Sequence, residues 1–500
     1  MTDMDIFLTS LAGQLQPMVL LTMVVSVVIG MIVGAIPGLT VSIAVALAVP
    51  VAIFLPTDYA LVMLASLYAA GVYGGSVSAI LLNAPGTPAS AATAIDGHQM
   101  ARQGLAKKAL NIALLASAFG SMFSILLLVT FAPLLAKFAL RFGPVEMAGL
   151  LLFTFTIVGT VSGSSMIKGL FSAALGILLA TIGSDPMIGV PRFTFGNTSL
   201  LDGLTYIPLL VGLFAIAEVL KMAGEGFPRQ SHDVELGSEN KARNRLTGSD
   251  MKAISMPMVR GSIIGSFVGL MPGIGSTISA FLAYADIKRS AGSTSKVGSG
   301  DIRAVAACES SNNATGGATF IPTLALGIPG DAVTAIILGA LVMLGVQPGP
   351  LLFVTNPGIV YTVYIVLFLS TVMMVIVGLV ATRALVYVLR VPNLYLMPIV
   401  ALTCAAGSFV VRNNVLDTFV MLGAGVMAFV FGRVGVPVAP LLISFIVTPP
   451  FEEAVRQSLA YSHGSFSIFV TNWFSLIAIL LSAIVVVLVA LAQRRRVIPA

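Results

Sequence analysis

The chain has 500 residues, of which 57% are hydrophobic and only 9% are charged, and its formal net charge is +6. A soluble domain usually carries about a quarter charged residues, so this chain lacks the polar side chains that a water-facing surface needs. The alternative, a large soluble protein, would have to bury many apolar helices that have almost no polar face. The composition therefore predicts an integral membrane protein embedded in a lipid bilayer.

Several apolar stretches are long enough to cross about 30 Å of hydrocarbon as helices. They include 19–36, 204–220, 359–380 and 467–491. The first residues, MTDMDIF, are acidic and precede a long apolar run, whereas a cleaved signal peptide starts with basic residues and has a shorter apolar core. We therefore expect an all-α, multi-pass membrane protein without a cleaved leader.

The first apolar helix is interrupted at GAIPGLT (34–40), where hydroxyl groups follow a Pro-Gly pair. A broken helix leaves backbone N–H and C=O groups unpaired, which lipid does not tolerate but a ligand in a water-accessible cavity can use. Gly38 marks this break, and the side chains of Thr40 and Ser42 follow it. The alternative is a simple kink, since small residues are common where membrane helices pack together.

A second break, NAPGTPAS (83–90), has the residue types that are typical of a helix start. Gly86 permits a turn, Thr87 can cap the helix and Pro88 suits its first position. The free N–H groups at such a helix start carry a partial positive charge, so an anion fits in front of Thr87. The break therefore predicts part of a binding site for an anion.

The second half of the chain repeats both designs. GLMPGIGST (269–277) repeats the first break, and GIPGD (327–331) repeats the second with Asp331 as the capping residue. Asp331 has two possible roles, a helix cap or a group that binds a coupling ion, because carboxylates inside a membrane are usually functional. Binding sites of secondary transporters form where helices are broken at matching positions of two repeats, so four such breaks favour a site over kinks.

Between these two breaks lies ACESSNNATGGATF (307–320), a crowd of polar side chains in apolar sequence. Hydroxyl and amide oxygens are hard ligands that suit sodium, and a buried carboxylate can carry a proton. The predicted coupling-ion residues are Glu309, Ser310, Asn312, Asn313, Thr315 and Asp331. We expect Na⁺ or H⁺ as the coupling ion, no other metal and no cofactor.

The motifs occur in the same order twice, which predicts two repeats. The expected divisions are a first repeat (1–225), a cytoplasmic linker (226–249), a second repeat (250–455), and an extra C-terminal helix with a basic tail (456–500). The loop 98–108 is basic, while its counterpart 345–358 in the second half is uncharged. Conversely, the loop 286–303 is basic, while its counterpart in the first half is the short loop 54–60. Basic loops face the cytoplasm, so we expect inverted repeats, about 11–15 membrane-embedded elements, a periplasmic N-terminus and a cytoplasmic C-terminus.

Other charges and residue classes narrow the function. Glu218, Glu452 and Glu453 lie near expected helix ends as caps or functional groups, and Lys168 and Arg192 either pair with a substrate carboxylate or reach the membrane interface. The chain has no GxxxxGK[ST] motif for an ATP-driven pump, no His or Cys cluster for an enzyme or metal site, and no basic run with aromatic residues for nucleic acid. A channel stays open as an alternative, but paired helix breaks fit alternating access better.

The motifs GAIPGLT, YGGSVSAILLNAPGTPASAATAIDGH, GLMPGIGS, ACESSNNATGGA and LALGIPGDAVTAIILGAL resemble those of the large membrane subunit of bacterial tripartite tricarboxylate transporters. The resemblance covers nearly the whole chain, including FAIAEVL (214–220), which has Ala217 where the family pattern has glycine. It implies a carrier in the bacterial inner membrane that works with a small membrane subunit and a periplasmic solute-binding protein. It also implies ion-driven import of a carboxylate, and similarity to other carriers of this kind implies an elevator motion.

We therefore predict a secondary transporter subunit that imports a small di- or tricarboxylate with Na⁺ or H⁺; the alternative is a standalone carrier or channel that needs no binding protein. The predicted substrate-binding residues are Gly38, Thr40, Ser42, Asn83, Gly86, Thr87, Ser90, Gly273, Gly275, Ser276, Thr277, Pro329, Gly330 and Thr334.

Overall fold

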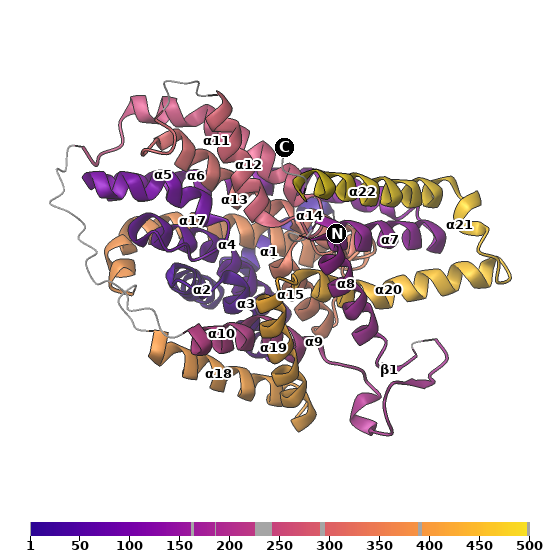
Figure 1. Cartoon of the computed structure of the whole chain (residues 1–500). Coiled ribbons are helices and arrows are strands. Elements are labelled where there is room, and N and C mark those ends of the chain that lie inside the picture. The colour runs from indigo at the N-terminus through magenta and orange to yellow at the C-terminus, as the bar shows by residue number, and fades with distance from the viewer. Residues whose placement is uncertain are drawn as a thin grey trace.

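The structure is a computed structural model that describes residues 2–161, 165–185, 187–225, 243–290, 296–388 and 393–497, and most of these residues lie in helices (Figure 1). The first half contains α1 (Asp3–Gln14), α2 (Pro17–Ala35), α3 (Val41–Ala52), α4 (Thr57–Leu82), α5 (Ser90–Met100), η1 (Ala101–Leu105), α6 (Ala106–Ala139), α7 (Pro144–Val161), α8 (Met166–Ala180), β1 (Gly183–Ser184), β2 (Pro191–Arg192), η2 (Thr198–Leu200), α9 (Tyr206–Val211), η3 (Gly212–Ile216) and α10 (Ala217–Glu225).

The second half contains α11 (Gly248–Gly269), α12 (Gly275–Ser290), α13 (Ile302–Ala318), α14 (Phe320–Leu326), α15 (Ala332–Met343), α16 (Leu352–Thr355), α17 (Pro357–Val388), α18 (Asn393–Val410), α19 (Val415–Val434), α20 (Ala439–Tyr461), α21 (Ile468–Thr471) and α22 (Trp473–Val497). Residues 226–242 of the predicted linker lie outside the described residues.

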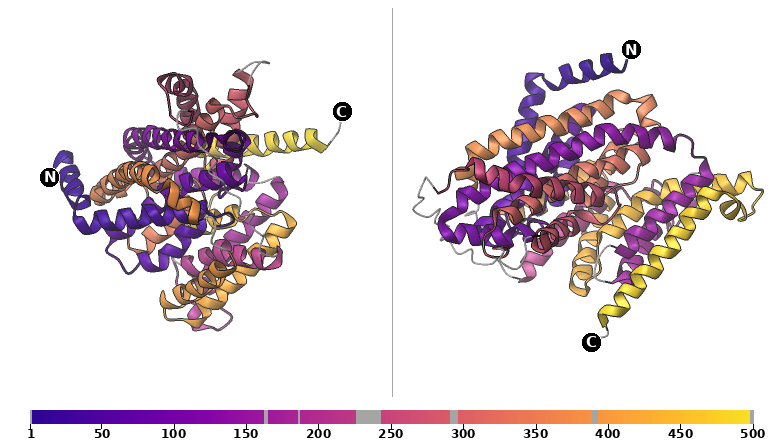
Figure 2. Two further views of the ribbon diagram at one scale, coloured as in Figure 1. Left: turned by 90° about the vertical axis from the view of Figure 1, so that its left-hand side faces the viewer. Right: turned by 90° about the horizontal axis from the view of Figure 1, so that it is seen from above.

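Eight helices in the described residues are long and apolar enough to cross a membrane. They are Pro17–Ala35, Thr57–Leu82, Ser90–Ala139, Pro144–Val161, Tyr206–Gly224, Pro357–Val380, Val415–Val434 and Trp473–Gln493, and four shorter apolar helices accompany them: Val41–Ala52, Met166–Ala180, Ala332–Met343 and Leu396–Val410. Figure 2 shows the long helices side by side, with α1 and α22 at edges of the molecule. This confirms the predicted all-α, multi-pass membrane class, while the number of true crossings stays a prediction.

Helices end at all four predicted breaks. Residues 36–40 separate α2 from α3, and residues 270–274 separate α11 from α12. Gly38 and Gly273 have φ of 89° and 79°, a left-handed conformation that glycine adopts without strain. The other two breaks lie between α4 and α5 and between α14 and α15.

The turn at the second break does not use Gly86 as its left-handed residue. Gly86 is not among the glycines with positive φ; the left-handed residue of this turn is Asn83, with φ of 53°. Gly86 is needed for a different reason: a Cβ at this position would collide with the carbonyl oxygen of Gly34 in the last turn of α2. The glycine therefore permits close approach of two backbones.

Close glycine contacts join corresponding helices within each half. A Cβ on Gly30 or Gly34 of α2 would collide with the backbone of α4, and one on Gly261 or Gly265 of α11 would collide with the backbone of α13. Small residues let membrane helices approach until their backbones touch, which increases van der Waals packing. Both halves thus contain the same tightly packed pair of helices.

Contacts between the halves also come in matching pairs. α8 packs on α20, with Gly176 against Leu441, and α19 packs on η3, with Gly425 against Ile216. In the same way α6 contacts α13, and α17 contacts α4. Two structural repeats would produce such reciprocal contacts; the inversion of one repeat relative to the other stays a prediction.

Three of the basic segments lie together at one end of the molecule. Lys108 Nζ lies 2.8 Å from Asp250, and Gln103 Nε2 donates to the Ser299 carbonyl oxygen at 2.7 Å. The buried carboxylate of Asp96 accepts backbone N–H groups of Gly298 and its neighbours in the loop before α13. The helical segment η1 after α5 and the loops before α11 and α13 therefore share one face.

A small hairpin that the sequence analysis did not predict lies toward the other end, where β1 pairs with β2 (Figure 1). Arg192 and Arg456 bracket the carboxylates of Asp185 and Glu452 at distances of 2.6–3.5 Å. Desolvation alone would raise the pKa of Asp185, but hydrogen bonds from the backbone N–H groups that follow it and the Arg456 guanidinium hold its pKa below its ordinary value. This four-membered ion-pair cluster fixes the hairpin to α20.

Candidate functional site

The four predicted breaks surround one cavity, here called the central cavity, with a volume of about 480 Å³. It is lined by Thr40, Val41, Ser42, Tyr68, Val72, Thr87, Pro88, Gly273, Ile274, Gly275, Ser276, Thr277, Asn312, Asp331, Ala332, Val333, Pro437, Ala439 and Ile443. Both halves of the chain contribute to the wall, so the two pairs of breaks form one site and not two.

The first half supplies the start of α3 and the turn that leads into α5. Thr40 is the N-cap residue of α3, but its side chain makes no capping bond, so the first N–H groups of α3 keep their capacity to bind a ligand. Thr87 and Ser90 cap each other: Thr87 Oγ1 accepts the Ser90 N–H at 3.3 Å, and Ser90 Oγ accepts the Thr87 N–H at 3.2 Å. The Thr87 hydroxyl thus accepts an N–H at the start of α5, as a capping residue does, although the N-cap position of α5 is Ala89.

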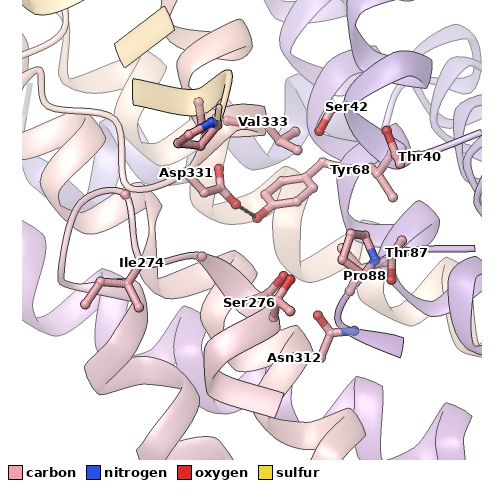
Figure 3. A pocket seen from close by; sticks show the side chains of 18 of the residues that line it. Thr40, Ser42, Tyr68, Thr87, Pro88, Ile274, Ser276, Asn312, Asp331 and Val333 are labelled. Atoms are coloured by element: carbon pink, nitrogen blue, oxygen red, sulfur yellow. Dashed lines mark hydrogen bonds between the residues drawn. The ribbon is translucent and has the colours of Figure 1, made fainter. Parts of the chain in front are cut away.

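The second half supplies the starts of α12 and α15. Asp331 is the N-cap residue of α15 and forms a reciprocal capping box with Thr334, whose N–H donates to Asp331 Oδ1 at 2.7 Å. Tyr68 of α4 donates its hydroxyl to Asp331 Oδ2 at 2.7 Å, across the cavity (Figure 3). The cap role of Asp331 is therefore present, and its second oxygen links the two halves.

Among the described residues, Asn312 is the buried polar side chain that both lines the central cavity and has an atom without a hydrogen-bond partner. It is only 1% exposed, and its Nδ2 has no hydrogen-bond partner among the described residues. It lies on the wall of the central cavity beside Ser276 (Figure 3). A buried amide that donates to nothing costs about 1–3 kcal/mol, so its position indicates a ligand or water that accepts its hydrogen bond.

The electrostatics of the central cavity come from backbone, not from basic side chains. Four helices, α3, α12, α15 and α20, begin at its wall, and the capped turn before α5 joins them. Among the described residues of the lining, Asp331 is the one charged side chain. Converging helix N-termini contribute a positive potential that suits an anion, and the carboxylate of Asp331 offsets part of it.

The structure brings nine of the residues predicted for substrate or ion to the central cavity: Thr40, Ser42, Thr87, Gly273, Gly275, Ser276, Thr277, Asn312 and Asp331. The other predicted substrate residues, Gly38, Asn83, Gly86, Ser90, Pro329, Gly330 and Thr334, lie outside its lining. Gly330 supports the wall, because its carbonyl oxygen accepts the N–H of Gly273 at 2.9 Å.

The remaining predicted coupling-ion residues are engaged in hydrogen bonds inside the protein. Glu309 is fully buried and accepts hydroxyls from Ser76, Thr93 and Ser117, on α4, α5 and α6. Asn313 donates to Ser117 Oγ at 2.8 Å and to the Glu309 carbonyl oxygen at 3.1 Å. Glu309 therefore joins three helices of the first half to α13.

Two further predicted ion ligands point elsewhere. Ser310 Oγ donates to the Ala307 carbonyl oxygen, and Thr315 Oγ1 lies 2.7 Å from Ser279 Oγ. The structure therefore does not gather the six predicted ion residues around one point. Cation binding by any of them stays a prediction, and no cluster of three His, Cys, Asp or Glu able to hold a metal occurs in the described part of the chain.

The charged residues with two possible roles now have partners. Glu218 pairs with Lys221 at 3.2 Å, Glu452 belongs to the hairpin cluster with Arg192, and Lys168 Nζ donates to the Val434 carbonyl oxygen at the end of α19. None of them lines the central cavity. These contacts therefore do not support a direct bond from Lys168 or Arg192 to a substrate in the central cavity.

Sequence reasoning missed two contributions to the wall. Tyr68 carries no local signal, because α4 is apolar on all sides and nothing marks the side that faces α15. The start of α20 does carry a local signal, because GVPVAP (435–440) is another break with glycine and proline, and Gly435 has φ of 68°. This break places Pro437 and Ala439 at the central cavity.

The described residues form apolar helices that are long enough to span a membrane, and four helix breaks surround a cavity that suits an anion. These features define the class of a polytopic membrane protein with an internal ligand site. The chain belongs to the tripartite tricarboxylate transporter TctA family, whose sequence profile matches residues 20–443. The predicted resemblance is confirmed, and the chain is a subunit of a tricarboxylate transporter system.

Two relatives come from Agrobacterium vitis. One, described as an uncharacterized 52.8 kDa protein in the TAR-I ttuC′ 3′ region, is 35% identical over 453 residues, which cover 89% of either chain. The other, described as an uncharacterized protein in the TAR-II ttuC′ 3′ region, is 33% identical over 208 residues, 42% of this chain and 86% of the relative. No solved structure shows a significant match to this chain.

Proposed function

We propose that the central cavity binds the carboxylate groups of a small organic di- or tricarboxylate during ion-driven import across the bacterial inner membrane. The observation that carries this proposal is the unpaired, buried amide of Asn312 in a cavity where four helices begin and no basic side chain lines the wall. Backbone N–H groups, hydroxyls and this amide bind the substrate in place of an arginine cluster.

The membrane orientation follows from the basic segments that share one face. That face is cytoplasmic by the positive-inside rule, which makes the hairpin end and the N-terminus periplasmic. A periplasmic solute-binding protein delivers the substrate, and a small membrane subunit completes the transporter, as the tripartite family membership supports. The chain itself catalyses no chemical reaction and needs no cofactor beyond a coupling ion.

Import proceeds by alternating access, in which the cavity opens to either side of the membrane in turn. The reciprocal contacts between halves support inverted repeats, and an elevator movement of the broken helices against the other helices fits the same architecture. Sodium or a proton drives the step, with Asn312, Asn313 and Glu309 on α13 as the residues closest to such a role.

Uptake in proteoliposomes tests the proposal. The full chain, co-purified with the small subunit and supplied with the binding protein, is expected to accumulate labelled di- or tricarboxylate under a sodium or proton gradient. Asn312→Ala should raise the half-saturation constant about ten-fold, the effect of losing roughly 1.4 kcal/mol of hydrogen bonding. Asn356→Ala, which alters an exposed asparagine remote from the cavity lining, is the control. An unchanged constant in Asn312→Ala would remove the central cavity as the substrate site.

The same assay separates the alternative function, a standalone carrier or channel. Uptake that needs the binding protein supports the tripartite mechanism. Equal uptake by the chain alone, without the binding protein, would favour the standalone carrier, and flux that does not saturate would favour a channel.

A further inference from the structure

A second cavity, here called the outer cavity, adjoins the central one and has a volume of about 530 Å³. The two share Thr40, Ser42 and Pro88, so the start of α3 and the turn before α5 form the partition between them. The rest of the outer wall comes from η3, α10 and the end of α19. An anion that leaves the central cavity past Thr40 and Ser42 enters this space directly.

The outer cavity differs from the central cavity in its charge. Lys221 of α10 and Arg433 of α19 line it, together with one acid, Glu218, whereas the central lining contains only Asp331. Lys221 pairs with Glu218 at 3.2 Å. Arg433 makes no ion pair within 4.0 Å in the described residues and lies 5.1 Å from the centre of the Phe429 ring. The balance of the lining is one positive charge, centred on Arg433.

The partition itself can bind an anion on either side. Thr40 and Ser42 offer hydroxyls to both cavities, and the first N–H groups of α3 have no side-chain cap. Gly38, at φ of 89°, holds the loop so close to α10 that a Cβ would collide with Met222. The polar start of α3 therefore lines the same cavity as Lys221 and Arg433.

We propose that the outer cavity is a second carboxylate-binding site, in which Arg433 and Lys221 hold the substrate next to the start of α3 as it passes between the central cavity and the cytoplasmic face. This rests on the proposed function for the direction of travel, but not for the binding of an anion. Arg433 lies in the last turn of α19, and Lys221 lies in the middle of α10; both have long side chains that can follow a moving ligand. Arg433 is the principal ligand, because Lys221 is shared with Glu218.

Charged thiol reagents test the site. Ala217 lines the outer cavity one helical turn before Lys221, so Ala217→Cys places a reporter beside it. The full chain in nanodiscs is treated with an anionic reagent, sulfonatoethyl methanethiosulfonate, and a cationic one, the trimethylammonium analogue. Each rate is normalised to that of a free thiol. The native Cys308 and Cys404 are buried, and the chain without the reporter gives the background.

We expect the ratio of the anionic to the cationic reagent's rate with the Ala217→Cys thiol to exceed the ratio for a free thiol. This ratio should fall about five-fold in Arg433→Gln and in Lys221→Gln, because each removes one positive charge several Å away. The control is Lys168→Gln, which removes a nearby lysine that lines neither cavity. Acetate, succinate and citrate are then tested as protectants. At least one should slow the anionic reagent in the reporter protein, and protection should survive Asn312→Ala but be lost in Arg433→Gln.

Two results would overturn the second site: a rate ratio that Arg433→Gln leaves unchanged, or protection by none of the three carboxylates. Protection lost in Asn312→Ala but retained in Arg433→Gln would assign binding to the central cavity alone. Failure of the central site appears differently, as normal half-saturation in Asn312→Ala, so the two proposals fail separately.

Discussion

Thr87 and Ser90 share one cap but differ in what else they contact. Each accepts the other's N–H, yet only Thr87 lines the central cavity. The structural cost of losing the cap can therefore be separated from loss of a ligand contact by comparing two substitutions of similar size.

We predict that Thr87→Ala and Ser90→Ala each lower stability by about 1 kcal/mol, the usual worth of a capping residue. Only Thr87→Ala should also raise the half-saturation constant for uptake. Thermal unfolding of the purified protein measures the first effect, and uptake kinetics measure the second. Equal kinetic effects in the two variants would mean that the cap, not a contact with substrate, explains them.

Tyr68 and Tyr364 provide a similar comparison. The Tyr68 hydroxyl donates to the carboxylate of Asp331, whereas the buried Tyr364 hydroxyl has no partner among the described residues. Hydrogen bonds to charged groups contribute about 1.5–3 kcal/mol, whereas a buried hydroxyl without a partner lowers stability by its desolvation.

Tyr68→Phe should therefore destabilise the protein by about 1.5–3 kcal/mol and slow transport, because it removes the bond that links α4 to α15. Tyr364→Phe should leave stability unchanged or slightly raised. Denaturation monitored by tryptophan fluorescence, with Trp473 as the single tryptophan, measures both. If both variants unfold alike, the bond to Asp331 contributes little to stability.

At the scale of helices, glycine has two different effects in this chain. Gly265 of α11 lies against the Ser311 carbonyl of α13, with no room for a Cβ. Gly423 of α19 has nothing within 4 Å of the position that a Cβ would occupy. Gly265 and Gly423 both lie inside helices, and neither has a positive φ. The two positions therefore differ in the space available for a Cβ.

We expect Gly265→Ala to separate α11 from α13 and to destabilise the protein by roughly 1–3 kcal/mol, as overpacking in a close-packed interior does. Gly423→Ala should stabilise by about 0.5–1 kcal/mol, since alanine is the better helix former. Membrane abundance and melting temperature report both changes. A destabilised Gly423→Ala together with a tolerated Gly265→Ala would contradict this account of the α11–α13 contact.

The helix breaks were predictable because the residues that make them act locally. Pro and Gly disfavour the helix interior through their own backbones, Asp331 caps α15, and the Thr87 hydroxyl accepts an N–H at the start of α5. The exact need for Gly86 was not predictable, because it depends on Gly34, a residue far away in the sequence. Tyr68 was missed for the same reason, as its partner Asp331 belongs to the other half.

At the scale of the molecule, composition predicted the membrane class, and repeated motifs predicted a site built by both halves. The hairpin of β1 and β2 was not predicted, since two-residue strands leave no alternating pattern and long-range ion pairs to Glu452 and Arg456 hold them. The coupling-ion residues were grouped by sequence proximity, but successive residues of a helix face different directions. Asn312 therefore faces the central cavity, whereas Asn313 donates to Ser117 inside the protein.

The relation between the halves gives the last prediction. Gln103 follows α5, and Gln347 follows α15, the corresponding helix of the second half; both side chains are exposed. If the repeats are inverted, the segments that follow corresponding helices lie on opposite sides of the membrane. The basic residues around Gln103 and their absence around Gln347 agree with that arrangement.

Gln103→Cys and Gln347→Cys should therefore react with a membrane-impermeant maleimide from opposite sides. In intact cells with a permeabilised outer membrane, Gln347→Cys should be labelled and Gln103→Cys protected; inverted membrane vesicles should reverse the result. The chain without an added cysteine is the control, because Cys308 and Cys404 are buried. Labelling of both positions from one side would mean that the halves are parallel, and the alternating-access proposal would then lose its symmetry. Labelling from the sides opposite to those expected would keep the inverted repeats and would exchange only the cytoplasmic and periplasmic faces.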